Sequence, residues 1–166
     1  MFSCSDSCSP EPSDENAYLS SHIERLRLSF QYWTGSDLLD CESAPVIAAR
    51  TLYEAPFALL SHGREDDPII NYANRTAQRL FEMDWNEFTK LPSRLSAEMP
   101  VQQERDALLK RVTENGYIDD YSGIRVSSTG KRFLIDHATV WTVRDHDGNH
   151  YGQAAMFNSW SMLKGE

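Results

Sequence analysis

Three groups of side chains in this sequence have residue types that could do chemistry. The segment DHDGNH at 145–150 combines two histidines with two aspartates, which are groups that could ligate a metal ion. The segment SHGREDD at 61–67 brings a serine, a histidine and several acids together, the residue types of a hydrolase triad. Cys4 and Cys8 are close enough in sequence to clamp a metal.

Each group also has a simpler interpretation. The Asp-Gly pair at 147–148 is typical of a hairpin turn, and a hairpin tip also accounts for the polar residues at 61–67. Catalytic triads are assembled across a fold rather than within one short segment. No histidine or cysteine follows Cys4 and Cys8 at a suitable spacing. We therefore expect no metal site and no catalytic residues, and interpret the protein as non-enzymatic.

Composition and charge restrict the class of partner. The chain of 166 residues has 16 Lys and Arg against 25 Asp and Glu, a formal net charge of -9. A field of this sign repels nucleic-acid phosphates and anionic lipid, so we expect no nucleic acid and no membrane as partner. The polar, acidic N-terminus does not look like a signal peptide, and no apolar run reaches the roughly 20 residues that span a bilayer. With three cysteines that form no disulfide framework, the sequence predicts a cytoplasmic protein.

The first third of the chain predicts a tail and two helices. Residues 1–13 are mainly Ser, Pro, Cys and acids, and we expect them to be disordered. A helix is predicted from the N-cap Ser13 to Gly35, and a second one from Ser43 to just before Pro56. The first helix has apolar residues at steps of 4, 3, 4 and 3: Leu19, Ile23, Leu26, Phe30 and Trp33.

This narrow apolar seam indicates a helix that packs on one partner. The partner is either the sheet of the same chain or a second subunit in a homodimer, and the sequence leaves both alternatives open.

After residue 56 the pattern changes to short strands. Asn74 is the predicted N-cap of the first of two short helices, and a longer helix is predicted from Pro100 to Gly116. The expected strands are 57–63, 68–73, 117–128, 131–145 and 151–160. This order predicts an α+β domain, with a five-stranded antiparallel sheet, helices on one of its faces, and the N-terminal helices as flanking elements.

The residues in this order resemble a known fold. The element characteristic of PAS domains, where the second strand enters the first helix, is matched by Asp67, Pro68, Ile69, Tyr72, Asn74, Ala77 and Phe81. The strings LYEAPFALLSHG, YANRTAQRLFEMDWNEFTKLPSRLSAE, GYIDDYSGIRVSS and VWTVRDHDGNHYGQAAMFNSW are similar to the PAS-like MEKHLA domain family, over roughly residues 40–160. We identify the chain as a stand-alone bacterial-type member. Its expected parts are the tail at 1–13, flanking helices at 14–55 and the PAS-like MEKHLA domain at 56–162.

The resemblance implies a sensory or regulatory module that acts through protein-protein contacts or self-association. In PAS domains a cavity between sheet and helices holds a flavin, a haem, a small metabolite or nothing, so the cofactor stays unknown. Light-sensing members form a flavin adduct with a cysteine where this chain has Ser93, whose hydroxyl cannot form it. Residues 101–113, in the helix that supplies an axial histidine in haem-binding members, contain no histidine. The alternative function is therefore a flavin- or haem-binding sensor without cysteine-adduct photochemistry.

Seven residues are candidates for the lining of this cavity: Tyr72, Asn74, Arg94, Tyr121, His137, Trp141 and Gln153. Asn74 either caps its helix or points its amide inward, and capping is the better explanation. Arg94 either binds an anion or pairs with a surface carboxylate, which is commoner.

The three later candidates depend on which way their strands face. Tyr117, Tyr121 and Arg125 share one face, which is a pocket wall if it points inward and a docking patch if it points outward. In strict alternation His137 shares a face with Trp141, although a histidine at the edge of the core is the simpler interpretation. Gln153 lies near the strand position that contacts flavin in PAS proteins, but if Gly152 is aligned there, Gln153 turns to the other face.

Overall fold

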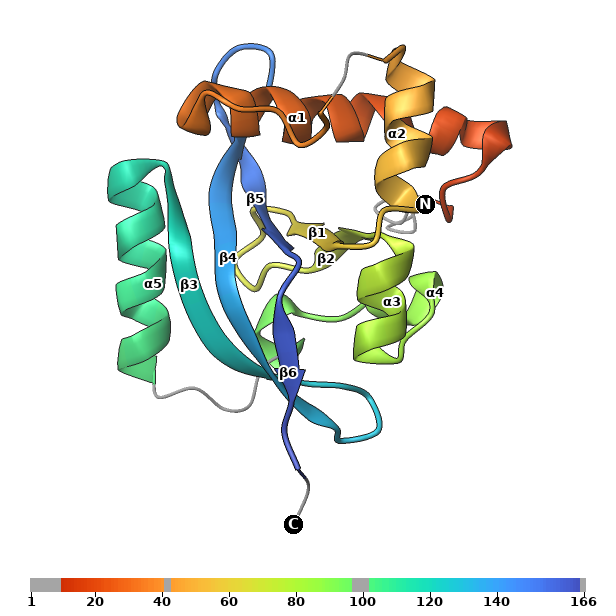
Figure 1. The fold of residues 1–166 in the computed structure, drawn as a ribbon. Helices are drawn as coiled ribbons and strands as arrows, with labels where there is room; N and C mark the ends of the chain where they lie inside the picture. Colours follow the sequence, from red (N-terminus) through yellow and green to blue (C-terminus); the bar gives the residue numbers. More distant parts are fainter. Residues whose placement is uncertain (1–9, 41–42, 97–101, 165–166) are drawn as a thin grey trace, which may run out of the picture.

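The computed structural model describes residues 10–40, 43–96 and 102–164 (Figure 1). Cys4, Cys8, Cys41 and most of the predicted tail lie outside these ranges. The elements in chain order are η2 (Asp14–Leu19), α1 (Ser20–Thr34), α2 (Pro45–Tyr53), β1 (Ala58–His62), β2 (Ile70–Ala73), α3 (Arg75–Phe81), α4 (Trp85–Phe88), η3 (Ser93–Ser96), α5 (Gln102–Asn115), β3 (Tyr117–Val126), β4 (Arg132–Arg144), β5 (His150–Phe157) and β6 (Trp160–Met162).

The strands form one antiparallel sheet in the order β2-β1-β5-β4-β3, which agrees with the predicted α+β fold. The predicted last strand at 151–160 is divided in two. β5 ends at Phe157, and β6 then pairs with the first half of β4, where Ile135 faces Trp160. The sheet therefore has a short sixth strand that the sequence pattern did not reveal.

A bulge in β4 reverses the side-chain pattern in the middle of this strand. His137 has the left-handed φ of 53°, and the pairing with β3 shifts around it. Phe133 and Ile135 lie on the same face as Ala138, whereas Trp141 lies on the opposite face. An extra residue at a bulge moves all later side chains to the other face, so strict alternation predicted the wrong face for Trp141.

Two apolar cores lie on the two faces of the sheet. On one face, which we call the inner face, Phe81 of α3 and Phe88 of α4 pack with Phe133, Ile135 and Phe157 of the sheet. On the outer face, α1 and α2 pack with Leu59, Tyr72, Trp141 and Val143. The sheet thus has helices on both sides, and the N-terminal flanking helices complete the outer core.

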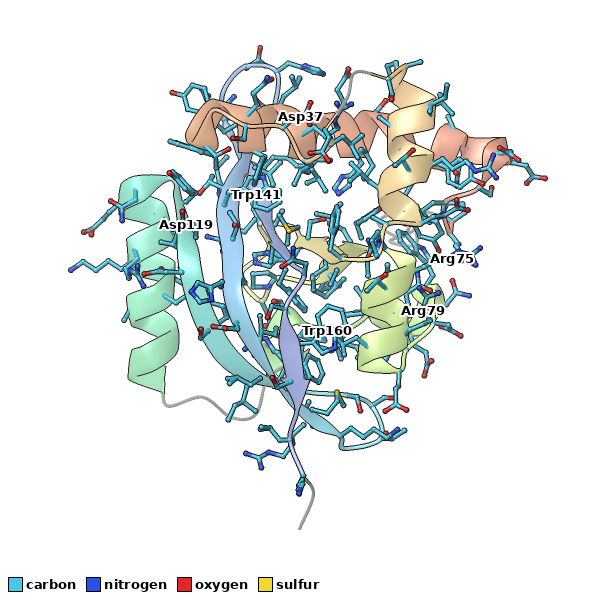
Figure 2. The ribbon with its side chains drawn as sticks, in the orientation of Figure 1. Asp37, Arg75, Arg79, Asp119, Trp141 and Trp160 are labelled. Atoms are coloured by element: carbon cyan, nitrogen blue, oxygen red, sulfur yellow. The ribbon has the colours of Figure 1, made fainter. Side chains whose placement is uncertain are left out.

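Helix α1 covers the outer face of the sheet with the predicted apolar seam. Ile23, Leu26 and Phe30 are buried, and the Phe30 ring meets Trp141 edge-on at 4.9 Å between centroids. The Trp141 indole Nε1 donates to the Leu26 carbonyl at 3.2 Å, and Trp141 lies between β4 and α1 (Figure 2). Leu19 and Trp33 are partly buried against the same core. In the structure the seam therefore packs on the sheet of its own chain, which is the first of the two alternatives that the sequence left open.

Trp33 connects the end of α1 to the end of α5. Gly116 follows α5 with a φ of 82°, and a Cβ placed there would lie 2.2 Å from the Trp33 ring. The Trp33 indole donates to the Thr142 carbonyl at 2.8 Å, and the Thr142 amide donates to the Gly116 carbonyl at 2.9 Å. We call this arrangement the Trp33–Gly116 contact, and it joins α1, α5 and β4.

A histidine lies under α1 at the edge of the outer face. The His22 Nε2 is 2.9 Å from the Ser61 Oγ, and this hydroxyl donates to the Asn71 Oδ1 at 2.5 Å. Because the Ser61 hydroxyl donates its hydrogen to Asn71, the His22 Nε2–H donates to the Ser61 oxygen. His22 therefore does not act as a general base toward Ser61. Burial, and then the charge of Arg25, lower the pKa of His22 to about 4.

We predict that Gly116→Ala destabilises the protein by about 3 kcal/mol or more, because the methyl group meets Trp33 in addition to the strain of a left-handed alanine. Gly130→Ala is the matched control, since Gly130 has a φ of 89° with nothing within 4 Å of the added Cβ. The control should lose only about 1 kcal/mol. Urea unfolding of both variants measures the difference, and equal losses would contradict the packing of Trp33 on Gly116.

We also predict that His22 makes stability depend on pH. Below its ordinary pKa of 6.5 the unfolded chain takes up a proton that folded His22, with a pKa of about 4, does not. Stability from this residue is complete above pH 6.5 and falls by up to about 3 kcal/mol toward pH 4. Urea unfolding across this range should show a smaller pH slope in His22→Gln than in wild type. The exposed His146→Gln serves as control, and an unchanged slope in His22→Gln would contradict the assignment.

Candidate functional site

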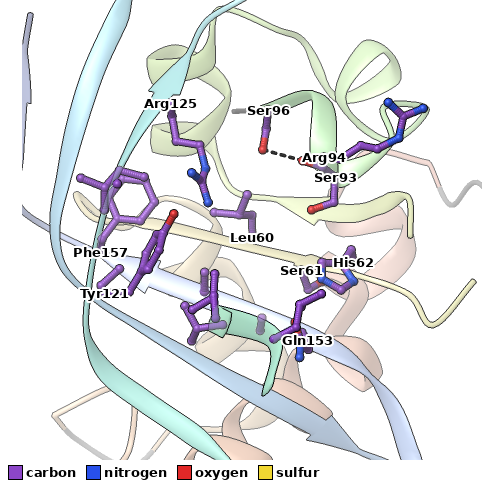
Figure 3. A pocket seen from close by; sticks show the side chains of 18 of the residues that line it. Leu60, Ser61, His62, Ser93, Arg94, Ser96, Tyr121, Arg125, Gln153 and Phe157 are labelled. Carbon is purple, nitrogen blue, oxygen red and sulfur yellow. Dashed lines mark hydrogen bonds between the residues drawn. The ribbon is translucent and has the colours of Figure 1, made fainter. Parts of the chain in front are cut away.

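A cavity of about 740 Å³ lies against the inner face of the sheet (Figure 3). Its walls come from β1, β3, β4, β5, η3 and α5. The size is within the range of small-molecule sites, which are commonly about 300–1,000 Å³. The fold therefore offers a partly open cavity where a ligand could contact several elements at once.

The floor of the cavity is apolar. It is formed where β1, β5 and β4 run side by side with Leu60 opposite Ala155, and Ala155 opposite Val140. Phe157 and Ile135 extend the same surface. Side chains two residues apart on paired strands share one face, which explains why these positions come together.

The wall on β3 holds Tyr121 and Arg125, so their face is the inward one. Bulges on either side of Tyr121 give this strand its register, and they leave Tyr117 opposite Trp141 on the outer side. The Arg125 guanidinium lies 5.3 Å from the centroid of the Tyr121 ring. A Cβ at Gly123 would lie 2.3 Å from the Tyr121 hydroxyl, so a glycine between the two residues leaves room for the ring.

The opposite wall is η3, which carries Ser93, Arg94 and Ser96. The Ser93 amide donates to the Pro68 carbonyl at 2.7 Å, which anchors this turn beside β2. Arg94 borders the cavity, but its guanidinium points away from the centre and pairs with Asp67 at 3.1 Å (Figure 3). Of the two alternatives for Arg94, pairing with a surface carboxylate is the one in the structure.

His62 and Gln153 form one end of the cavity. They face each other across β1 and β5, where the backbones approach so closely that a Cβ at Gly152 would lie 2.2 Å from the His62 carbonyl oxygen. Gln153 is on the cavity side of β5, so the alternative in which it turns outward is not the one in the structure. The His62 Nδ1 lies 2.8 Å from the Gly63 carbonyl.

Four of the seven candidates do not line the cavity, and Asn74 is the first. Its Oδ1 accepts from the Ala77 and Leu59 amides at 3.1 Å, and its Nδ2 donates to the Leu52 and Phe57 carbonyls at 2.9 Å. The side chain is buried and its bonds hold α2, β1 and α3 together. Asn74 is the predicted helix cap, with an additional role as a connector that the sequence did not indicate.

Tyr72, Trp141 and His137 were also expected in the lining, and the register of their strands explains why they are elsewhere. Tyr72 is opposite Ser61 on the outer face, where its ring meets Trp85 at 5.7 Å. Burial raises the pKa of Tyr72 well above its usual value. Trp141 lies on the outer face because of the bulge, and His137 at the bulge is 77% exposed with its Nδ1 3.0 Å from Asp136.

The lining also includes residues that were not expected from the sequence, among them Leu60, His62, Ser96, Arg111 and Phe157. The alternation of Leu60 and His62 on β1 was a usable signal, because inward positions on a strand recur at every second residue. Arg111 had no such signal, since its place depends on how α5 packs beside β3. Its guanidinium pairs with Asp120 at 2.8 Å.

The described part of the chain holds no group of three or more His, Cys, Asp or Glu side chains that could bind a metal. Within the same residues no helix is both long and apolar enough to cross a membrane. The hydroxyl, amide, guanidinium and imidazole groups around the apolar floor are suited to binding a small amphipathic molecule.

The sequence of this chain matches a known protein family. The model of the MEKHLA domain matches residues 20–162, so the match begins at the first residue of α1, well before the expected domain start at 56. The Arabidopsis thaliana homeobox-leucine zipper protein ATHB-14 is 24% identical over 85% of this chain and 17% of its own length. The homeobox-leucine zipper protein HOX10 of Oryza sativa subsp. indica is 22% identical over 81% and 16%.

This chain spans about a sixth of the length of these plant relatives. The stand-alone bacterial-type organisation expected from the sequence stays a prediction.

Solved structures agree with this fold. A PAS domain from Colwellia psychrerythraea has a TM-score of 0.60 at 9% identity and covers 70% of this chain and 94% of its own. An RNA-binding Light-Oxygen-Voltage receptor has a TM-score of 0.59 at 19% identity over 72% and 36% of the two chains. The light-state dimer of the fungal blue-light photoreceptor Vivid has a TM-score of 0.54 at 13% identity over 89% and 95%. The chain belongs to the MEKHLA domain family and has a PAS-like α+β fold.

Proposed function

We propose that this protein is a non-enzymatic PAS-like regulatory module that acts through protein-protein contacts and is gated by a small ligand in the cavity. The family and the fold support a sensory domain. The observation that carries the proposal is the Trp33–Gly116 contact, because α5 forms a wall of the cavity and Gly116 directly follows its last residue. A change in that wall has a direct physical route to α1.

The route from cavity to surface is short. Arg111 on α5 lines the cavity, and Gly116 at the end of this helix carries the ring of Trp33. Because a packed interface transmits small shifts rather than absorbing them, a ligand that moves α5 also moves the C-terminal end of α1. In this proposal α1 is the output element.

The solvent side of α1 offers the contact surface. Leu28 and Tyr32, four residues apart, are 53% and 62% exposed. The Tyr32 ring is held in place by Arg144, whose guanidinium lies 3.9 Å from its centroid, and by edge-on contact with Trp33 at 4.7 Å. Aromatic side chains with restricted rotamers are favourable anchors for protein contacts.

We propose a second copy of this chain as the partner. The Vivid dimer covers 89% of this chain, which is more than the region from 56 to 162 alone, and this likeness supports an assembly that involves the flanking helices. We further propose that the protein acts in the cytoplasm. The net charge of -9 supports the proposal that it has neither nucleic acid nor a membrane as partner.

A second candidate function is a flavin- or haem-binding sensor without cysteine-adduct photochemistry. It is supported by the likeness to Light-Oxygen-Voltage proteins and by Gln153 on the cavity wall. Ser93, which stands where light-sensing PAS domains have the adduct-forming cysteine, lies on the opposite wall. A visible absorption spectrum of the purified protein with the bands of either cofactor would favour this candidate.

For self-association we predict that Leu28→Asp weakens the dimer at least about tenfold, because it places a charge in an apolar contact. Met162→Asp is the matched control, since Met162 on β6 is also 53% exposed. The molar mass from light scattering over a concentration series should show a dimer for wild type and for the control. A monomeric wild type, or a Leu28→Asp variant with the mass of wild type, would contradict the proposal.

A further inference from the structure

The charged side chains in the described lining of the cavity are basic and not acidic. Its described lining contains four basic side chains, namely His62, Arg94, Arg111 and Arg125, and no Asp or Glu. The chain as a whole has nine more Asp and Glu than Lys and Arg, whereas the described lining has three Arg and no Asp or Glu. A cavity lined in this way attracts anions and disfavours cations.

Two of the three arginines are already neutralised. Arg94 pairs with Asp67 and Arg111 pairs with Asp120, and in both pairs the side chains are about half exposed. Their guanidinium groups are therefore directed to the rim of the cavity and to solvent.

Arg125 is different. Its contacts among the described residues are the Tyr121 ring at 5.3 Å and the carbonyl of the adjacent Ile124 at 3.3 Å, and none of them is a carboxylate. Figure 3 shows its side chain pointing across the cavity toward Leu60. A guanidinium has five N–H donors, so most of the donors of Arg125 are available for a ligand.

The surroundings of Arg125 suit one end of an amphipathic ligand. Ser93 on the opposite wall adds a hydroxyl, whereas the Ser96 hydroxyl is used in a bond to the Ser93 carbonyl at 2.8 Å. Leu60, Val140 and Phe157 form the apolar floor next to these groups. A planar guanidinium binds a carboxylate with two parallel hydrogen bonds, and the floor would bury an apolar body attached to it.

We propose that the cavity binds a small organic monoanion, with its carboxylate on Arg125 and its aromatic or aliphatic body on the floor formed by β1, β4 and β5. Among the lining arginines, Arg125 is the one without a carboxylate partner in the described part of the chain. A single guanidinium balances one negative charge, which favours a monocarboxylate over a more highly charged phosphate ester. This inference rests on the proposed ligand-gated function and names the chemical class of the ligand.

The test compares two probes of the same shape, 3-phenylpropanoate and its neutral amide 3-phenylpropanamide, by calorimetric titration of the full chain. The carboxylate should bind wild type at least about tenfold more tightly than the amide. Arg125→Met should remove this preference while leaving the amide affinity within about twofold, because it keeps the length of the side chain and removes the charge. Arg94→Met is the control, since it removes a lining arginine that is held by Asp67, and the preference should persist.

Three results would overturn the proposal. Equal affinity of wild type for both probes would leave a ligand cavity without anion selectivity. If Arg94→Met lost the preference for the carboxylate and Arg125→Met kept it, the anion would bind at η3 and not at Arg125. Binding of neither probe at millimolar concentration by folded protein would contradict a carboxylate site on Arg125. All three results can be distinguished from a failure of the regulatory proposal. In that case wild type and Leu28→Asp would have the same molar mass.

Discussion

The structure depends on the burial of the outer face of the sheet under α1. Trp141 and Val143 of β4 form an apolar surface that would face water without this helix. The indole of Trp141 bonds to the backbone of α1 at Leu26, and the indole of Trp33 on α1 bonds to the backbone of β4. These reciprocal bonds satisfy both indole N–H groups and fix the position of the helix along the strand. The flanking helix is therefore part of the folded unit, in agreement with a family match that begins at Ser20.

This constraint also explains how the two sides of the sheet communicate. β4 contributes Ala138 and Val140 to the cavity and Trp141 and Val143 to the α1 interface, so one strand borders both the candidate site and the proposed output. The Trp33–Gly116 contact adds a second connection through α5. Arg125 is on β3, which pairs with β4 along its length and begins directly after Gly116, nine residues before Arg125.

Much of the fold could be predicted from local signals. Asn74 and Asp84 cap their helices through side-chain bonds to Ala77 and Glu87, and Gly35 ends α1 in the left-handed conformation, as such residue types do in general. The site was harder to predict. Arg94, Tyr121 and Gln153 line the cavity, whereas a left-handed residue at His137, which the alternation along the strand did not indicate, sends Trp141 to the other face. The role of Arg125 depends on which other arginines find a carboxylate, and those pairings are set by tertiary structure.

The central claim is that the occupied cavity is sensed at α1 through the Trp33–Gly116 contact. Nitrogen-15 NMR of the labelled protein tests it directly, with 3-phenylpropanoate titrated into the sample. We predict that the Gly123 amide in the cavity, the Gly116 amide and the Trp33 indole N–H shift with the same half-saturation. Shifts at Gly123 without shifts at Gly116 and Trp33 would contradict the account.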